Sequence, residues 1–276
     1  MSFGPAIGYP DGMKAAAKTA PRAAPVKRAG RRPKSDTPDA PALSRDAVVQ
    51  CAASLAQKEP ITEISMVRLA REMGVAPALI HYYVGSRDGL LSAVMNFAFK
   101  ERVENLPPLT GDWRADLEAV ARISHRMHAR WPGLASYIVT HNRFRLFQKV
   151  QPGEVDYGLA FFDHLGRILR SGGFSKDQAA LAYHLLMLFL VGVGAATAHR
   201  QTPSEHGEFI VGYVSQSDPQ RLPGAAFLAK PFAKIDERRT FEGGLKLLLD
   251  GFASWLDAQA STPAGSSRRT ALPTGA

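Results

Sequence analysis

The sequence predicts an all-α protein built from a small three-helix head and a larger helical body. Apolar residues recur at three- and four-residue spacing through most of residues 44–260, the spacing of amphipathic helices. Gly and Pro interrupt these patterns at intervals, as expected where helices end. Near the start of this region, two short helical patterns are joined by a three-residue turn containing Gly74. A helix, a short turn with Gly and a second helix form the helix-turn-helix arrangement.

The helix-turn-helix is centred on residues 65–91, and its boundaries follow from local chemistry. Ser65 is a good N-cap for the first helix, and Gly74 is suited to the left-handed conformation that ends it. Pro77 fits the first turn of the second helix, which we expect to run to about Val84. Ser86 then caps a longer helix to about residue 103. A preceding helix over residues 44–58 completes the head.

This stretch resembles the TetR family of bacterial regulators over about residues 44–99. The residues that match the family pattern in one register are Val67, Ala70, Gly74, Val75, Ile80, Tyr82, Tyr83, Arg87, Leu90 and Leu91. Three positions depart from it: Ala76 replaces the usual small hydroxyl cap, His81 the usual Tyr, and Val84 the usual Phe. The first two lie on or near the DNA-facing side, so the resemblance implies an atypical operator.

The resemblance implies that the second helix enters the major groove of double-stranded DNA, which admits one α-helix. Small residues at its start allow close approach, and tyrosine hydroxyls and arginines suit phosphates. For Tyr83 and His81, packing inside the head is the alternative to DNA contact. The expected contact residues are Arg45, Ser65, Arg68, Ala76, Pro77, Ala78, Leu79, His81, Tyr82, Tyr83 and Arg87.

The two ends of the chain have no apolar periodicity, and we expect residues 1–43 and 261–276 to be disordered. Residues 1–43 hold eight Lys and Arg against three Asp and Glu, although the whole chain has a net charge of only +9. The cluster Lys27, Arg28, Arg31, Arg32 and Lys34 is either a minor-groove motif similar to an AT-hook or a nonspecific electrostatic tether.

Composition limits the class of protein further. The single cysteine, Cys51, excludes an internal disulfide and fits a reducing cytosol; its place on an apolar stripe favours burial over redox chemistry. No P-loop, nucleophile elbow or His-Glu-x-x-His motif is present, so we expect no enzyme activity.

The body, residues 104–260, is predicted to contain helices at 113–130, 133–150, 155–171, 176–200 and 240–257, with an irregular, mobile loop at 201–235. Residues 180–198 are nearly all apolar, which fits either a membrane span or a buried or subunit-interface helix. The last helix resembles the closing helix of the family, with the pattern F-x-x-G-L-x-x-L-L-x-G. The resemblance implies a homodimer in which helices 176–200 and 240–257 of both subunits form a four-helix bundle, without a membrane.

The body also suits a pocket for a small apolar or aromatic effector, because its amphipathic helices carry polar and aromatic residues. The candidate lining residues are Trp113, His125, His128, Tyr137, His141, Phe144, Phe162, His184 and Met187. His125 and His128, at i and i+3, have no placed carboxylate or cysteine partner, so we expect neither a metal nor another cofactor.

The leading hypothesis is therefore a cytoplasmic, nucleoid-associated transcriptional regulator, a homodimeric repressor that an effector releases from a two-fold operator. An architectural protein that binds any duplex through its basic arm is the alternative. A membrane-anchored sensor is a third hypothesis.

Overall fold

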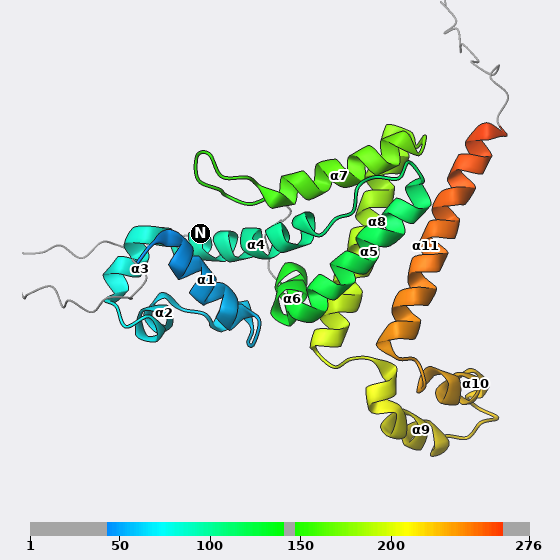
Figure 1. Ribbon diagram of the computed structural model, residues 1–276. Coiled ribbons are helices and arrows are strands. Elements are labelled where there is room, and N and C mark those ends of the chain that lie inside the picture. The colour runs from blue at the N-terminus through cyan, green and yellow to red at the C-terminus, as the bar shows by residue number, and fades with distance from the viewer. Residues whose placement is uncertain (1–42, 141–146, 262–276) are drawn as a thin grey trace, which may run out of the picture. The chain divides into compact units, whose positions relative to one another are not determined.

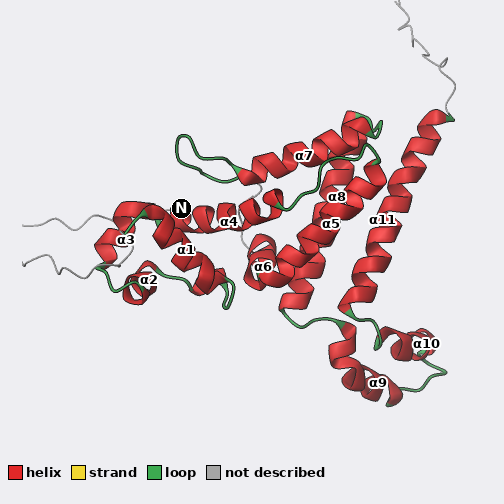
Figure 2. Ribbon diagram, in the orientation of Figure 1, coloured by secondary structure: helices red, strands yellow, loops and turns green. Residues whose placement is uncertain are grey.

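The computed structural model describes residues 43–140 and 147–261 of the 276-residue chain, and these residues form helices and loops without a β-strand. Figure 2 shows this all-helical architecture. The basic cluster at residues 27–34 and the predicted pocket residues His141 and Phe144 lie outside the described residues.

The head contains α1 (Arg45–Ala56), the short 3-10 helix η1 (Ile61–Glu63), α2 (Met66–Glu72) and α3 (Pro77–Val84), followed by α4 (Arg87–Glu104). Ser44, Ser65 and Ser86 cap α1, α2 and α4, each accepting a hydrogen bond from the backbone N–H three residues on, at 3.1, 3.1 and 3.0 Å. The core of the head is fully enclosed: Val48, Leu69, Ile80 and Leu90 have no exposed surface. The predicted helix-turn-helix is therefore present, with boundaries set by the predicted caps.

The body is formed by α5 (Trp113–Arg130), α6 (Pro132–Thr140), α7 (Tyr157–Ser171), α8 (Lys176–Ala198) and α11 (Glu237–Ala260). Helix α8 packs against α5, α6, α7 and α11, so it is the central element of the body (Figure 1). Phe161, Leu165, Leu186 and Phe252, from α7, α8 and α11, lie at the centre of this second core.

Two predictions about the body are wrong. Residues 201–235 do not form an irregular loop, because they contain η2 (Pro203–His206), α9 (Gly207–Ser215) and α10 (Pro223–Phe232), and α9 packs against α10 (Figure 1). Pro203 and Pro223 stand in the first turns of their helices, where a missing N–H costs nothing, so they start helices that we expected them to break.

The second error is the helix expected over residues 133–150. Helix α6 can be followed as far as Thr140, where the described segment stops, and residues 147–150 are not helical. Apolar residues at helical spacing misled the prediction here, because Gln148 and Lys149 instead bind the side of α4. The Ser92 hydroxyl donates to Gln148 Oε1 at 3.2 Å and accepts from the Lys149 backbone N–H at 3.3 Å.

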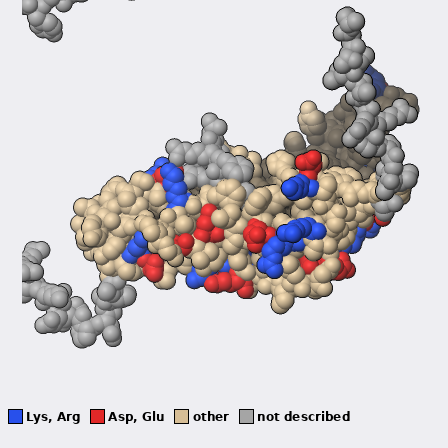
Figure 3. All heavy atoms as spheres, turned by 90° about the horizontal axis from the view of Figure 1, so that it is seen from above, with Lys and Arg blue, Asp and Glu red and all other residues tan. Residues whose placement is uncertain are grey.

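Head and body meet along α4 and at one close backbone approach. Gly133, at the start of α6, lies so near η1 that an added Cβ would be 3.2 Å from Pro60 Cα. Trp131 is buried beside this contact and donates its indole N–H to Glu101 Oε2 at 3.2 Å. Acidic and basic side chains are interspersed over the face seen in Figure 3, so no single-sign patch of described residues dominates it.

Candidate nucleic-acid interface and ligand site

Helix α3 presents a continuous exposed face of small and aromatic residues. Ile80 and Val84 point into the core of the head, whereas Tyr82 is 80% and Leu79 is 43% exposed. Ala76, Pro77, Ala78 and His81 are also exposed. Ala76 forms no side-chain cap, which leaves the first N–H groups of α3 without the hydroxyl partner usual at this position. This face has the size and composition that close approach to a major groove requires.

Tyr83 and His81, for which sequence left two roles open, have different environments. Tyr83 is half-buried and donates its hydroxyl to the Leu43 carbonyl at 2.7 Å, so it joins α3 to the start of α1. His81 is exposed, with Nδ1 3.4 Å from the Gly85 carbonyl. The structure thus gives Tyr83 a structural contact and leaves the imidazole of His81 at the surface.

The predicted arginines at the edges of the head all have partners within the protein. Arg87 donates to the Thr62 carbonyl, Arg68 pairs with Glu59 at 2.7 Å, and Arg45 pairs with Glu154. Ser65 is engaged as the cap of α2. Phosphate contacts by these arginines would therefore compete with existing bonds, whereas the side chain of Tyr82 is largely exposed.

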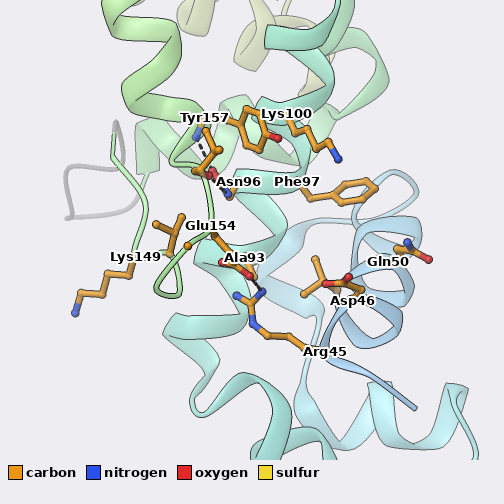
Figure 4. A pocket seen from close by; sticks show the side chains of 14 residues that line it. Arg45, Asp46, Gln50, Ala93, Asn96, Phe97, Lys100, Lys149, Glu154 and Tyr157 are labelled. Atoms are coloured by element: carbon orange, nitrogen blue, oxygen red, sulfur yellow. Dashed lines mark hydrogen bonds and ion pairs between the residues drawn. The ribbon is translucent and has the colours of Figure 1, made fainter. Parts of the chain in front are cut away.

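The Arg45–Glu154 pair closes one end of a surface hollow between α1, α4 and the loop before α7 (Figure 4). In this hollow Asn96 donates to the Val155 carbonyl at 2.9 Å and accepts from the Tyr157 N–H at 2.9 Å. These bonds attach the loop of the body to the helix that leaves the head. The residues that line this hollow thus join head and body, a contact that the sequence did not predict.

An uncovered apolar face runs along α8 and α11. On α8, Leu181, His184, Leu188 and Gly192 are exposed at successive turns, with Leu188 58% exposed. On α11 the exposed row is Gly243, Leu247, Gly251 and Ser254, with Leu247 74% exposed. The segment Lys176–Ser215 is long and apolar enough to span a membrane. Only 28% of its most apolar 18-residue stretch is buried within one chain, so most of this stretch needs a cover from outside the chain. We name these eight residues the α8–α11 face.

Five polar side chains of the body have a buried atom without a hydrogen-bond partner. One is Thr197, near the end of α8; we name the other four the buried polar cluster: Arg102, Ser124, His128 and Tyr183. Arg102 Nε, Ser124 Oγ, His128 Nδ1 and Tyr183 Oη are each buried without a hydrogen-bond partner among the described residues. They come from α4, α5 and α8, which pack together with α7 (Figure 1). Since buried polar groups are normally paired, these four unpaired ones make the interior of the body a candidate ligand site.

Burial dominates the electrostatics of the cluster. It lowers the pKa of Arg102 to about 9, which still leaves the guanidinium charged at neutral pH. Burial, and then the charge of Arg102, lower the pKa of His128 to about 3, so this imidazole is neutral. Burial raises the pKa of Tyr183 to about 12 and keeps its phenol protonated. At pH 7 the cluster therefore holds one positive charge and three neutral polar groups.

The predicted pocket residues are divided between several places. His128 belongs to the cluster, and Phe162 touches Tyr183, with ring centroids 4.8 Å apart. Tyr137 is buried in the core shared with the head, Trp113 packs on Phe174, and His184 lies on the α8–α11 face. Met187 is half-buried in the core of the body.

His125 and His128 point in different directions. The ring of His125 stacks on Phe241 at 4.1 Å and faces Glu237 at 3.4 Å, whereas His128 packs against Gly194 of α8. Residues 43–140 and 147–261 contain no group of three His, Cys, Asp or Glu placed to hold a metal ion.

Sequence analysis missed Arg102, Ser124 and Tyr183 as site residues. A signal for Arg102 was present, because it follows Leu91, Met95 and Ala98 at the spacing of the buried stripe of α4. A charged residue at a core position of an amphipathic helix is unusual, and it identifies the position as one to explain.

A helix-turn-helix head with an exposed α3, joined by α4 to a larger helical domain, is the arrangement of DNA-binding transcriptional regulators. The family model described as "Tetracyclin repressor-like, C-terminal domain" matches residues 107–256. The chain therefore belongs to the TetR family, whose members are DNA-binding transcriptional regulators of the cytoplasm rather than enzymes.

Curated relatives agree with this assignment. The HTH-type transcriptional repressor Rv1353c of Mycobacterium tuberculosis is 25% identical over 228 residues, which cover 81% of this chain and 85% of the relative. The repressor DrrR1 of Streptomyces coeruleorubidus is 36% identical over 107 residues, and that match spans only 38% of either protein.

Solved structures show the same fold. Apo ActR of Streptomyces coelicolor superposes with a TM-score of 0.68 at 25% identity, covering 80% of this chain and all of ActR. ActR in complex with actinorhodin gives a TM-score of 0.66 at 26% identity, covering 78% of this chain and 97% of ActR.

Proposed function

We propose that the protein is a repressor that binds a two-fold DNA operator as a homodimer and is released by a small effector bound in the body. The observation that carries the DNA-binding part is the exposed face of α3, centred on Tyr82 and Leu79 and held by the buried side chains of Ile80 and Val84. In this proposal α3 lies in the major groove and Tyr82 contacts a phosphate, while Ala76, Pro77 and Ala78 approach base edges.

The homodimer follows from the α8–α11 face. Leu188 and Leu247 are large, exposed and apolar on the two helices, and Gly192, Gly243 and Gly251 allow close approach of a second pair of helices. A second copy of the chain covers this face with α8 and α11 of its own, which gives a four-helix bundle. His184 lies in this interface, and no membrane is needed to cover the apolar surface.

The effector part is supported by the buried polar cluster and by the relative ActR, whose structure has been solved in complex with actinorhodin. An effector that binds one dimer geometry better than the other shifts the population and changes the spacing of the two heads. The two heads must sit about one helical turn apart, or a multiple of it, to occupy both half-sites.

The DNA-binding proposal is tested by affinity for the DNA upstream of the protein's own gene, compared with a scrambled duplex at one physiological salt concentration. We expect the wild type to prefer the upstream DNA by about a thousandfold or more. Tyr82→Ala should weaken specific binding at least tenfold. Tyr213→Ala is the matched control, because Tyr213 is also exposed, at 66%, but lies on α9.

Equal affinity for both duplexes, unaffected by Tyr82→Ala, would contradict the proposal and favour a nonspecific architectural role carried by the basic arm at residues 27–34. The dimer is tested separately by sedimentation of Leu188→Glu, which should be monomeric. Leu159→Glu is its control, since Leu159 is 52% exposed on α7, away from the α8–α11 face. A dimeric Leu188→Glu protein would contradict the assigned interface.

A further inference from the structure

Arg102 is a buried cation without a counter-ion in the described part of the chain. Only 6% of the residue is exposed, and its side chain forms no ion pair or hydrogen bond with any described residue. Its guanidinium instead stacks on the ring of Phe161, 3.4 Å from the centroid, and lies 4.6 Å from the centroid of Phe99. The flat faces of the guanidinium are thus covered by aromatic rings, while Nε at its edge has no acceptor.

The other buried charge of the body shows how such groups are normally satisfied. Asp116, 4% exposed, accepts from the backbone N–H and the hydroxyl of Thr110, at 3.0 and 2.8 Å, and from the Gly111 N–H. Its two oxygens are therefore paired by the chain itself. A protein that fully pairs a buried carboxylate but leaves a buried guanidinium unpaired is missing an anionic partner for the latter.

The neutral members of the cluster extend the site around Arg102. Tyr183 and His128 lie close enough to Arg102 for its charge to act on both. Ser124 and His128 share one face of α5, one turn apart, and the Ser124 hydroxyl lacks even the usual bond to the carbonyl one turn earlier. The phenol of Tyr183 and the hydroxyl of Ser124 are donors that suit the oxygens of an acidic ligand.

A row of aromatic rings leads from the surface to this cluster. Phe147 and Phe162 are 45% and 41% exposed, and their ring centroids lie 5.7 Å apart, edge to face. Phe162 in turn meets Tyr183 edge to face at 4.8 Å. An aromatic ligand can therefore pack against these rings as it enters, while its acidic group reaches Arg102.

We infer that the effector of this protein is an aromatic acid, whose carboxylate or phenolate pairs with Arg102 and accepts hydrogen bonds from Tyr183 and Ser124 in the interior of the body. This inference rests on the proposed function for its regulatory meaning, because it names the ligand class of the same domain. It also narrows the effector class expected from sequence, a small apolar or aromatic molecule, to an aromatic molecule with an acidic group.

The test uses the full-length protein and two probes of equal size, 2-naphthoate and its neutral analogue 2-naphthamide, with binding measured by calorimetry at pH 7. We expect the wild type to bind the acid at least tenfold more tightly than the amide. Arg102→Met should lose this preference, and Arg102→Lys should retain part of it, because it keeps the charge but not the planar donor array.

Arg170→Met is the matched control, since Arg170 is exposed on α7 and its replacement should leave the preference for the acid unchanged. Equal binding of the two probes to the wild type, or no binding of the acid at millimolar concentration, would overturn the inference. A preference for the acid that survives in a folded Arg102→Met protein would overturn it as well.

DNA binding is measured on the same samples, so that the two proposals fail separately. If the protein binds its operator specifically but shows no preference for the acid, the proposed function stands and the inference of an aromatic-acid effector is wrong. If the protein prefers the acid through Arg102 but does not distinguish upstream from scrambled DNA, the ligand site stands and the proposed operator binding is wrong.

Discussion

The head and the interior of the body differ in whether their charged side chains have a partner within the chain. In the head, Ser44, Ser65 and Ser86 cap their helices, and the predicted arginines are bonded to Thr62, Glu59 and Glu154. Three buried atoms of the head, Arg45 Nε, Glu59 Oε1 and Arg68 Nε, lack a hydrogen bond, but each belongs to a side chain that forms an ion pair through another atom. In the body, Arg102, Ser124, His128 and Tyr183 keep unpaired atoms. The comparison teaches that the charged side chains of a surface for DNA can have partners in the free protein. In an interior site for a small molecule, polar groups instead stay unpaired until the ligand binds.

The largest expected effect concerns the packed core that holds the recognition helix. Ile80→Ala removes a side chain with no exposed surface and should reduce the free energy of unfolding by about 2–5 kcal/mol, with loss of DNA binding. Leu79→Ala, at the next position, is 43% exposed and should change stability by less than about 0.5 kcal/mol. Urea unfolding of both variants measures the difference. Equal losses would mean that α3 does not present the face assigned to it.

The second effect is a dependence of stability on pH that arises in the body. His128 has a native pKa of about 3, below its unfolded value near 6.5, so the unfolded state binds a proton that the native state does not. The contribution of the neutral His128 to the free energy of unfolding is complete above pH 6.5. It is lost as the pH falls toward 3, which lowers the free energy of unfolding by a few kcal/mol.

The free energies of unfolding at pH 7 and pH 4.5 should therefore differ less in His128→Gln than in the wild type, while His81→Gln, at an exposed position of α3 outside the α8–α11 face, should keep the full difference. His164 is half-buried with a lowered pKa, and it leaves a residual slope of the same sign in both variants. An unchanged slope in His128→Gln would contradict the burial of a neutral imidazole.

A smaller effect is expected at the N-terminus of α3, which lacks a side-chain cap. Ala76→Ser supplies the hydroxyl cap that α3 lacks and should raise the free energy of unfolding by about 1 kcal/mol. Ala78→Ser, inside the first turn, is the control without a capping position and should not stabilise the protein. The denaturation midpoints of the two variants distinguish them, and equal midpoints would exclude a missing cap at Ala76.

The smallest effect is expected at the contact between head and body in Figure 4. Glu154→Gln removes the partly exposed ion pair with Arg45 and should cost about 0.2–1 kcal/mol, because solvent screens such pairs. The loss should shrink further at high salt. A loss of several kcal/mol would show that this pair, rather than the packing around α4, holds the loop to the head.

Sequence predicted the head well and the ligand site poorly, for a physical reason. Caps at Ser65 and Ser86 and the turn at Gly74 are local signals, which a short window contains in full. The buried polar cluster is assembled from Arg102, Ser124 and Tyr183, residues far apart in the chain whose burial depends on packing of the whole body. The helices at residues 207–232 were missed because a proline that starts a helix and one that ends a helix look alike without their neighbours.

The central claim is that the body carries a buried positive charge kept for a ligand rather than for folding. The most direct measurement is the free energy of unfolding of Arg102→Met without any ligand, compared with Arg170→Met. The account predicts that Arg102→Met is more stable than the wild type, by about 1–4 kcal/mol at most, because it removes a desolvated charge without a partner. Arg170→Met should be unchanged. A clear loss of stability in Arg102→Met, comparable to that of Ile80→Ala, would show that Arg102 serves the fold and would contradict the claim.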